Sequence, residues 1–331
     1  MQAYSVIINN IDYCCDRYMP SGYSRKHNIQ ELLEKVSKIR GIKGVELVVG
    51  SLFNRENVDM VNELLKKYRL EAVSLIPDHS GRQTWGRGTF TAPDSDTRKA
   101  AIDETLMTIE LARKVGCKLI NIWNGQDGYD YPFQADYARS HEYLADGLRK
   151  CADSAPDMKI AIEYKAKEPR NHGFVSNVYS TLLLLKEIDR DNVGLTIDSG
   201  HSLLAYENMA EAAVTAMKYK KLFHMHFNDN YRLWDDDMIA GSIHTVEFIE
   251  LFFWLKKCNY DGWISLDQYP YREDGVNAAD QSIQWLRSIR NAANSIKEET
   301  AATILAKQDA VAANALMRQL IFGDRELYEK V

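Results

Sequence analysis

The sequence predicts an α/β protein, a (β/α)8 barrel of the TIM-barrel type with a C-terminal helical extension. Eight short apolar segments recur along the 331 residues, and a longer segment with helical periodicity follows each of them. No glycine-rich dinucleotide fingerprint follows the first segment, where the chain reads NNIDYCCDRY, which disfavours an open doubly wound sheet. Polar residues also stand at the ends of many predicted strands rather than one or two, as a barrel site requires.

The predicted strands are rich in Val, Ile and Leu and are bounded by Gly, Asn or Asp, which favours buried parallel strands. They are residues 4–8, 44–49, 71–76, 118–123, 158–163, 193–198, 222–227 and 263–267. The predicted helices are residues 29–39, 58–68, 97–115, 135–152, 178–188, 209–217, 246–257 and 278–289. Each intervening segment is long enough for the crossover that joins two parallel strands.

The eight-fold pattern divides the chain into two parts. Residues 1–295 are predicted to form one barrel domain, and residues 296–331 a C-terminal helical arm that contains no proline. Two interpretations of the arm stay open: a helix packed on the outside of the barrel, or an arm that wraps a neighbouring subunit. We expect a homodimer or homotetramer.

Composition excludes several classes of protein. The net charge is −6, whereas nucleic-acid binders usually carry a basic domain or stripe. No apolar run approaches the roughly 20 residues that a membrane span needs, and the N-terminus lacks a signal-peptide pattern. Five cysteines without regular spacing indicate free thiols rather than a disulfide framework. We therefore expect a cytoplasmic protein that binds neither nucleic acid nor membrane.

Four predicted strands in a row end in a residue that commonly binds metal ions. Glu163, Asp198, His226 and Asp267 end the fifth, sixth, seventh and eighth strands. The carboxyl ends of barrel strands meet at one face, so these side chains are expected to converge. Three carboxylates and one imidazole suit Mn²⁺, Mg²⁺ or Co²⁺ better than a thiolate-preferring metal. A capping or salt-bridging role explains any one of them, but four in register predict a metal site.

More ligands stand beside these four. His201 closes the DSGH motif three residues after Asp198, and the WDDD motif places Asp235 and Asp237 on the same side of an extended loop. A solvated acidic turn is the alternative for WDDD alone. Together with His201, it predicts a second cation close to the first, able to polarise neighbouring substrate oxygens.

Three further residues are candidates for chemistry. Lys165 follows Glu163 by two positions, and a lysine beside cations makes sense if it donates to a substrate oxygen that gains negative charge. Trp123, before a loop with two glycines, offers a flat apolar wall. His79, with Asp78 beside it, is suited to moving a proton. A surface lysine and a hydrogen-bonded loop histidine are the corresponding structural alternatives.

At this point the motifs resemble those of the xylose isomerase-like barrels, a family of divalent-metal sugar isomerases and epimerases. The segment from GTFTAPD to IWNGQDG is similar to the stretch that ends in the family's Trp-Gly-Gly-Arg-Glu-Gly motif. EYKAKEPR resembles its Glu-Pro-Lys-Pro-x-Glu-Pro-Arg motif, and DSGH and LDQYP fit its remaining metal positions. The resemblance covers the third to the eighth strands.

The resemblance implies two metal positions. One would be held by Glu163, Asp198, His226 and Asp267 and would bind two sugar hydroxyls. The other would be held by His201, Asp235 and Asp237, with Asp198 bridging, and would help to move hydrogen between C1 and C2. Lys165 would bond the substrate carbonyl oxygen.

The chain departs from xylose isomerases at two places. They have a ring-opening histidine at the end of the second strand, where this chain has Val48 and Val49. Asp198 and His226 also replace a Glu and an Asp. In these respects the chain is similar to bacterial L-rhamnose isomerases, which would give the ring-opening role to His79. Arg17 and Trp85, in loops 12–23 and 80–90, and Glu168 and Arg232 are further candidates for sugar contacts.

The predicted function is therefore an aldose–ketose isomerase that uses two divalent cations, Mn²⁺ first, in a 1,2-hydride shift. Catalysis is assigned to Lys165, His79 and Asp235. The alternative is a ketose 3-epimerase that removes and returns a proton. Ketose 3-epimerases share the spacing from His226 to Arg232. They use a pair of metal-bound Glu residues, however, whereas this chain has Asp267 at the end of the eighth strand. A metal-dependent endonuclease for damaged DNA and a non-catalytic sugar-binding module are the remaining rivals.

Overall fold

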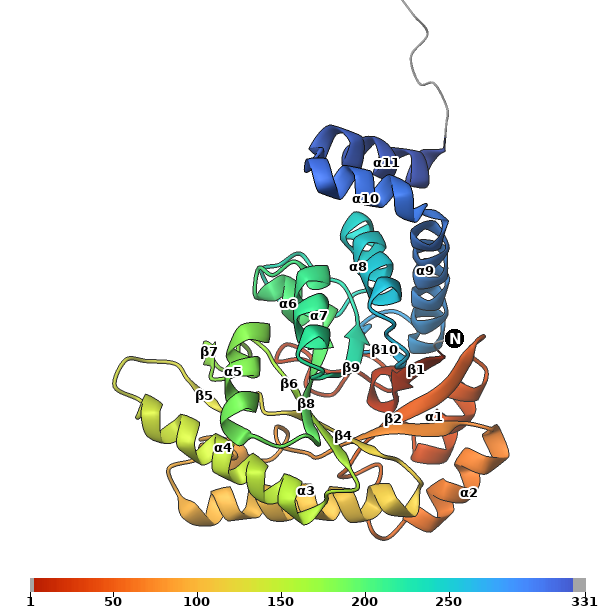
Figure 1. Cartoon of the computed structure of the whole chain (residues 1–331). Helices are drawn as coiled ribbons and strands as arrows, with labels where there is room; N and C mark the ends of the chain where they lie inside the picture. Colours follow the sequence, from red (N-terminus) through yellow and green to blue (C-terminus); the bar gives the residue numbers. More distant parts are fainter. Residues whose placement is uncertain (1–2, 324–331) are drawn as a thin grey trace, which may run out of the picture.

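A computed structural model describes residues 3–323 and shows a closed barrel of eight parallel strands, as the sequence predicts (Figure 1). Neighbouring strands follow the order β1-β10-β9-β8-β6-β4-β3-β2 around the barrel. The barrel strands are β1 (Tyr4–Ile7), β2 (Ile42–Val48), β3 (Glu71–Ile76), β4 (Leu119–Trp123), β6 (Lys159–Glu163), β8 (Val193–Asp198), β9 (Leu222–Phe227) and β10 (Ile264–Leu266). All eight predicted strands are confirmed, although the last one ends just before Asp267.

Helices follow the strands and surround the barrel (Figure 1). They are α1 (Ile29–Ser37), α2 (Val58–Tyr68), α3 (Ser95–Lys114), α4 (Tyr137–Ser154), α5 (Val178–Ile188), α7 (Met209–Lys218), α8 (Thr245–Lys257) and α9 (Gly275–Ser295). None of the helices in the described part of the chain is both long and apolar enough to cross a membrane.

The first helix shows how local sequence sets these boundaries. Asn28 accepts a hydrogen bond from the Glu31 backbone, and the Glu31 side chain accepts one from Asn28, which forms a capping box. Leu32, Leu33 and Val36 then fall on one face and are buried against the barrel. The remaining barrel helices bury apolar faces in the same way, so one hydrophobic core extends around the strands.

Five short elements lie on the loops and were not predicted. The 3-10 helices η1 (Ile8–Ile11) and η2 (Gln83–Trp85) follow β1 and β3. A two-stranded ribbon, β5 (Gly128–Tyr129) with β7 (His172–Gly173), joins the loops after β4 and β6. The helix α6 (Ser199–Leu204) begins directly after β8, which ties the DSGH motif to a helix start.

The region after α9 is helical, as predicted, but it consists of two helices, α10 (Glu298–Lys307) and α11 (Ala310–Phe322). Gln308 takes a left-handed conformation and Asp309 caps α11, which breaks the helix in two. The two helices lie beyond α8 and α9, away from the strands (Figure 1). Together with Phe253 and Trp254 of α8 they line an apolar groove. Residues 324–331 of the predicted arm lie outside the described residues.

Candidate active site

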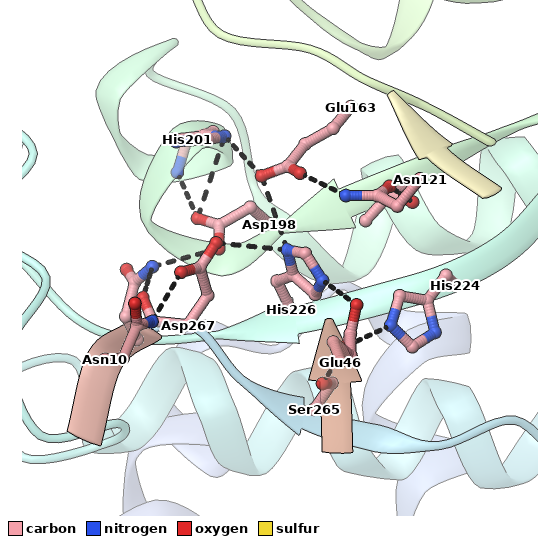
Figure 2. A network of polar contacts seen from close by, with 12 residues as sticks. Asn10, Glu46, Asn121, Glu163, Asp198, His201, His224, His226, Ser265 and Asp267 are labelled. Atoms are coloured by element: carbon pink, nitrogen blue, oxygen red, sulfur yellow. Dashed lines mark hydrogen bonds and ion pairs between the residues drawn. The ribbon is translucent and has the colours of Figure 1, made fainter. Parts of the chain in front are cut away.

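Four predicted ligands converge at the carboxyl ends of the barrel strands (Figure 2). Glu163 and Asp198 close β6 and β8, His226 pairs in register with Asp198, and Asp267 follows β10. One ligand atom from each lies within 4.8 Å of the others. His226 Nδ1 is 3.4 Å from Glu163 Oε1 and 3.1 Å from Asp267 Oδ2. The structure therefore brings these four side chains together as the sequence predicts.

Three asparagines orient the carboxylates of this cluster. Asn121 Nδ2 donates to Glu163 Oε2 at 2.7 Å, and the Thr196 hydroxyl donates to Asn121 Oδ1 in turn. Asn228 Nδ2 donates to an oxygen of Asp198, and Asn10 Nδ2 donates to an oxygen of Asp267. Such outer contacts fix how ligating carboxylates point. Sequence reasoning missed all three, because asparagine is ordinary turn chemistry at Asn10 and Asn228, and a single polar residue inside a strand, such as Asn121, does not identify its partner.

A second cluster adjoins the first through Asp198. Ligand atoms of Asp198, His201 and Asp235 also lie within 4.8 Å of one another. Asp198 caps α6 by accepting from the His201 backbone, and His201 Nε2 is 3.0 Å from Asp235 Oδ2. His201 Nδ1 faces Glu163 Oε1 at 3.3 Å. Asp237 lines the same cavity but belongs to neither cluster among the described residues.

The buried charges of the two clusters are strongly perturbed. Burial and repulsion from neighbouring carboxylates raise the pKa of Asp198 to about 7, and burial raises that of Asp237 well above its usual value. Although burial disfavours its charged form, Asp198 and Asp235 raise the pKa of His201 to about 9. Perturbed groups in a cleft are typical of functional sites.

The donor set fits divalent cations. Each cluster contains a histidine whose Nδ1 is buried without a hydrogen bond to the rest of the described chain, in His201 and in His226. Each of these nitrogens lies within 3.4 Å of a carboxylate oxygen. Carboxylate and imidazole ligands of this kind suit Mn²⁺, Mg²⁺, Co²⁺ or Zn²⁺.

Lys165 lies at the edge of a cavity of about 230 Å³ that both clusters border. Its Nζ is 2.8 Å from Asp235 Oδ2, 3.2 Å from Glu168 Oε2, and 5.3 Å from the ring centre of Trp123. Although burial disfavours the charge, Asp235 and the other acidic neighbours raise the lysine pKa. Burial also raises the pKa of the Glu168 carboxyl. A fixed ammonium group therefore stands beside the ligand clusters, against the face of Trp123.

Two predicted site residues, His79 and Trp85, lie away from the inner cavity. His79 does not reach the cavity: its ring packs edge-on against Trp85 and Phe90, and its Nε2 approaches the Ala101 carbonyl of α3 at 3.2 Å. Trp85 is buried beside it and donates to the Asp78 carbonyl. The placement therefore corrects both expectations.

The two predicted arginines also lie outside the inner cavity. Arg232 turns toward Glu247 on α8, at 3.4 Å, rather than toward the clusters. Arg17 lines an outer cavity of about 870 Å³, which shares Asp235 and Asp237 with the inner one. Arg17 is thus placed at the mouth of the site, and Arg232 is not.

Comparison with known proteins identifies the family. Residues 33–289 match the xylose isomerase-like TIM barrel family, and the chain belongs to this family. A xylose isomerase from Thermus thermophilus is 28% identical over 198 residues, which is 57% of this chain and 51% of that protein. A probable sugar isomerase from Mesorhizobium japonicum is 28% identical over 194 residues, 58% of this chain and 44% of that protein. The chain thus spans about half the length of the curated relatives it matches.

A solved structure supports the same fold. The D-tagatose 3-epimerase-like protein superposes with a TM-score of 0.69 at 20% identity, covering 87% of this chain and 98% of that one. At this identity the similarity concerns the fold alone. The predicted family is therefore confirmed, whereas the expected closeness to L-rhamnose isomerases remains a prediction.

Proposed function

We propose that the protein is a metal-dependent aldose–ketose isomerase acting on a free sugar by a 1,2-hydride shift. The observation that carries this proposal is the pair of ligand clusters that share Asp198, with the ammonium group of Lys165 beside them. Two adjacent cations and one fixed cationic donor are what a hydride shift between neighbouring carbons needs. The sugar isomerase relatives agree with this reaction class.

Two divalent cations, Mn²⁺ first and otherwise Mg²⁺ or Co²⁺, would occupy the clusters. Glu163, Asp198, His226 and Asp267 would hold one, and Asp198, His201 and Asp235 the other, with Asp237 nearby. When bound, such cations supply Lewis-acid polarisation of neighbouring sugar oxygens.

The chain's own residues position the sugar. Lys165 donates a hydrogen bond to the carbonyl oxygen, and Asp235 and Glu168 hold the ammonium group in place. The ring of Trp123 forms an apolar wall of the cavity that keeps water from the carbons between which hydrogen moves. His79 has no part in this proposal because its ring is turned toward α3.

The runner-up is a ketose 3-epimerase, the activity in the name of a structural neighbour that shares the fold. The two reactions differ in the fate of hydrogen. An epimerase exchanges the abstracted proton with solvent, whereas a hydride shift transfers hydrogen directly between carbons.

Turnover in D₂O separates the two reactions. The chelated protein is reloaded with Mn²⁺, Mg²⁺ or Co²⁺ and assayed over a panel of aldoses and ketoses, with the chelated protein as the blank. We expect interconversion of an aldose and a ketose with essentially no deuterium in the product. Deuterium at C3 with a change of configuration there would identify the epimerase instead.

Asp235→Ala tests whether the chain is an enzyme at all. This change removes a ligand of the second cluster and the partner of Lys165. We expect kcat to fall by roughly 100-fold or more while sugar still binds to the first cluster. Asp236→Ala, its neighbour outside the clusters, is the matched control. If both variants bind sugar equally well, and neither they nor the wild-type protein show turnover, the protein is a sugar-binding module.

A further inference from the structure

A layer of polar side chains crosses the barrel interior beneath the ligand clusters, where barrels are usually filled by branched apolar residues (Figure 2). Its centre is Glu46, in the middle of β2, with no exposed surface. Around it stand Ser74 on β3, His224 on β9 and Ser265 on β10, all buried. None of these four side chains belongs to the proposed catalytic residues or borders the inner cavity.

The Glu46 carboxylate accepts hydrogen bonds at both of its oxygens. Oε1 lies 2.8 Å from His224 Nε2 and also accepts from the Ser265 hydroxyl. Oε2 lies 3.3 Å from His226 Nε2 and also accepts from the Ser74 hydroxyl. An ionised carboxylate can only accept, so each of these four contacts places a hydrogen on the partner. His226 therefore carries its hydrogen on Nε2.

The two nitrogens of His226 face opposite environments. Nε2 points down to Glu46, whereas Nδ1 points up to Glu163 Oε1 and Asp267 Oδ2. With hydrogen fixed on Nε2, the neutral ring presents its lone pair on Nδ1 to the ligand cluster. Metal-binding histidines commonly donate their other ring nitrogen to a carboxylate, which sets the tautomer and the ring orientation.

We propose that Glu46 is a positioning residue that locks His226 as the Nε2–H tautomer and so makes Nδ1 the ligand atom of the first cation. The proposal rests on the metal centre of the proposed function. Glu46 reaches His226 across the barrel interior, since β1 and β10 separate β2 from β9. Ser74 donates a further hydrogen bond to the carboxylate oxygen that faces His226, and Ser265 donates one to the oxygen that faces His224.

A third cation among Glu46, His224 and His226 is the competing explanation, because their ligand atoms also lie within 4.8 Å of one another. Three features oppose it. Both carboxylate oxygens already accept from serine hydroxyls, and Glu46 does not line the cavity that the other clusters border. His226 Nε2 also cannot both donate to Glu46 and bind a cation.

Three variants separate the contributions that the hydrogen-bond acceptors, the charge and the packing of Glu46 make to cation affinity. Glu46→Leu keeps the volume but removes both acceptors, and we expect affinity for one cation to fall by roughly 10- to 100-fold. Glu46→Gln returns a carbonyl acceptor toward His226 and should restore most of that affinity. Ser265→Ala, the matched control, removes one hydrogen bond from Glu46 but leaves its contact with His226, and should stay within about threefold of wild type. Isothermal titration with Mn²⁺ and the absorption spectrum with Co²⁺ measure these effects without sugar.

The wild-type protein provides a test that does not depend on a variant folding. In protein labelled with ¹⁵N-histidine, the resonances of His226 are assigned by their loss in His226→Gln. With Zn²⁺ bound, we expect a protonated Nε2 and a coordinated Nδ1. In the metal-free protein, we expect an exchange-protected Nε2–H proton. The Nε2–H signal of the metal-free protein tests the role of Glu46 even if no cation binds. Failure to bind any cation would refute the proposed function but not the hydrogen bond from His226 to Glu46.

Three results would overturn the proposal. The first is a Zn²⁺-loaded protein in which Nε2 is the coordinated atom. The second is a folded Glu46→Leu protein with unchanged cation affinity and an unchanged Co²⁺ spectrum. The third is a third bound cation in wild type that Glu46→Leu loses, because Glu46 would then be a ligand itself.

Discussion

Lys165 is a buried cation beside ligand clusters that would themselves hold cations, so its charge would lower metal affinity, and the proposed function makes it the donor to the substrate carbonyl. We expect Lys165→Met to lower kcat by roughly 100-fold or more, because the carbonyl oxygen loses its donor. Cation affinity should stay or rise, because repulsion disappears and Asp235 is released. Steady-state kinetics and metal titration measure the two effects.

Lys167→Met is the matched control for Lys165. Its ammonium group reaches the Leu233 carbonyl at the surface, outside the inner cavity. We expect kinetics close to wild type. Equal losses in the two variants would remove the catalytic role from Lys165.

His79 makes a contribution to stability that depends on pH. Burial lowers its pKa from 6.5 to about 4, so the folded protein favours the neutral ring. The lowered pKa adds up to about 3 kcal/mol to the free energy of unfolding above pH 6.5. This contribution is lost as the pH falls from 6.5 toward 4. We expect His79→Gln, which keeps a donor toward the Ala101 carbonyl, to lose less stability than wild type between pH 7.5 and 4.5. Urea unfolding at the two pH values checks this, and parallel losses would contradict it.

Residues at strand ends were predictable from the sequence, and residues just beyond them were less so. Side chains alternate between the two faces of a strand, which fixes those that point into the barrel interior. This alternation places Glu163, Asp198 and His226 close together. After β3 the chain turns, so Asp78 faces the cavity and His79 faces α3. No periodicity in the sequence reports such a turn.

Glu46 was missed for a different reason. The segment GVELVV has the composition of a buried strand, and its only charged residue was passed over. A carboxylate in a buried strand is costly unless it is hydrogen-bonded or paired. That cost is a sequence signal for a buried polar partner, although the identity of the four partners depends on strands far away in the chain.

At the level of elements, one buried carboxylate holds the loop between β3 and α3. Asp127 accepts hydrogen bonds from the backbone of Thr89, Phe90 and Thr91 and from both threonine hydroxyls. We expect Asp127→Ala to lower the free energy of unfolding by about 3 kcal/mol or more, because several buried donors lose their acceptor. Urea unfolding measures the loss.

Asp136→Ala is the matched control for Asp127. It removes an exposed cap at the start of α4, where Asp136 accepts from the Arg139 backbone at 3.1 Å. We expect a loss of about 1 kcal/mol. Similar losses in the two variants would show that the Asp127 contacts do not stabilise the loop beyond a surface cap.

Long elements were predicted well because their hydrophobic period extends over several turns or a whole strand. All eight barrel strands and the first seven barrel helices lie within two residues of the expected bounds, whereas α9 runs six residues beyond its expected end at residue 289. The ribbon of β5 and β7 and the helix α6 were missed, because elements this short leave no period to detect. Their place depends on tertiary contacts such as the pairing of Tyr129 with His172.

At the level of the whole molecule, every ligand of the two clusters comes before α9. A chain that ends after Lys297 loses α10 and α11 but keeps the complete barrel. We expect this truncated protein to retain cation affinity and turnover within about threefold, since none of the arm's residues borders the inner cavity in the described structure. Loss of cation binding would contradict the domain boundary near residue 295.

Light scattering of the same truncated protein distinguishes the two interpretations of the arm. If the arm wraps a neighbouring subunit, truncation reduces the assembly to a smaller species. If α10 and α11 pack only on their own barrel, the number of chains in the assembly stays the same. Its mass then falls only by the mass of the deleted residues.

Asp198 belongs to both ligand clusters, which links the occupancy of the two sites. In the proposed metal centre, the first cation to bind would take up part of the negative charge of Asp198 and would repel the second across a few ångströms. The two affinities are therefore expected to show negative cooperativity, and by linkage each ion weakens the other by the same factor. A titration of the metal-free protein should then show a tight first step and a weaker second one. The protein would respond to metal supply in two stages, with turnover following the second.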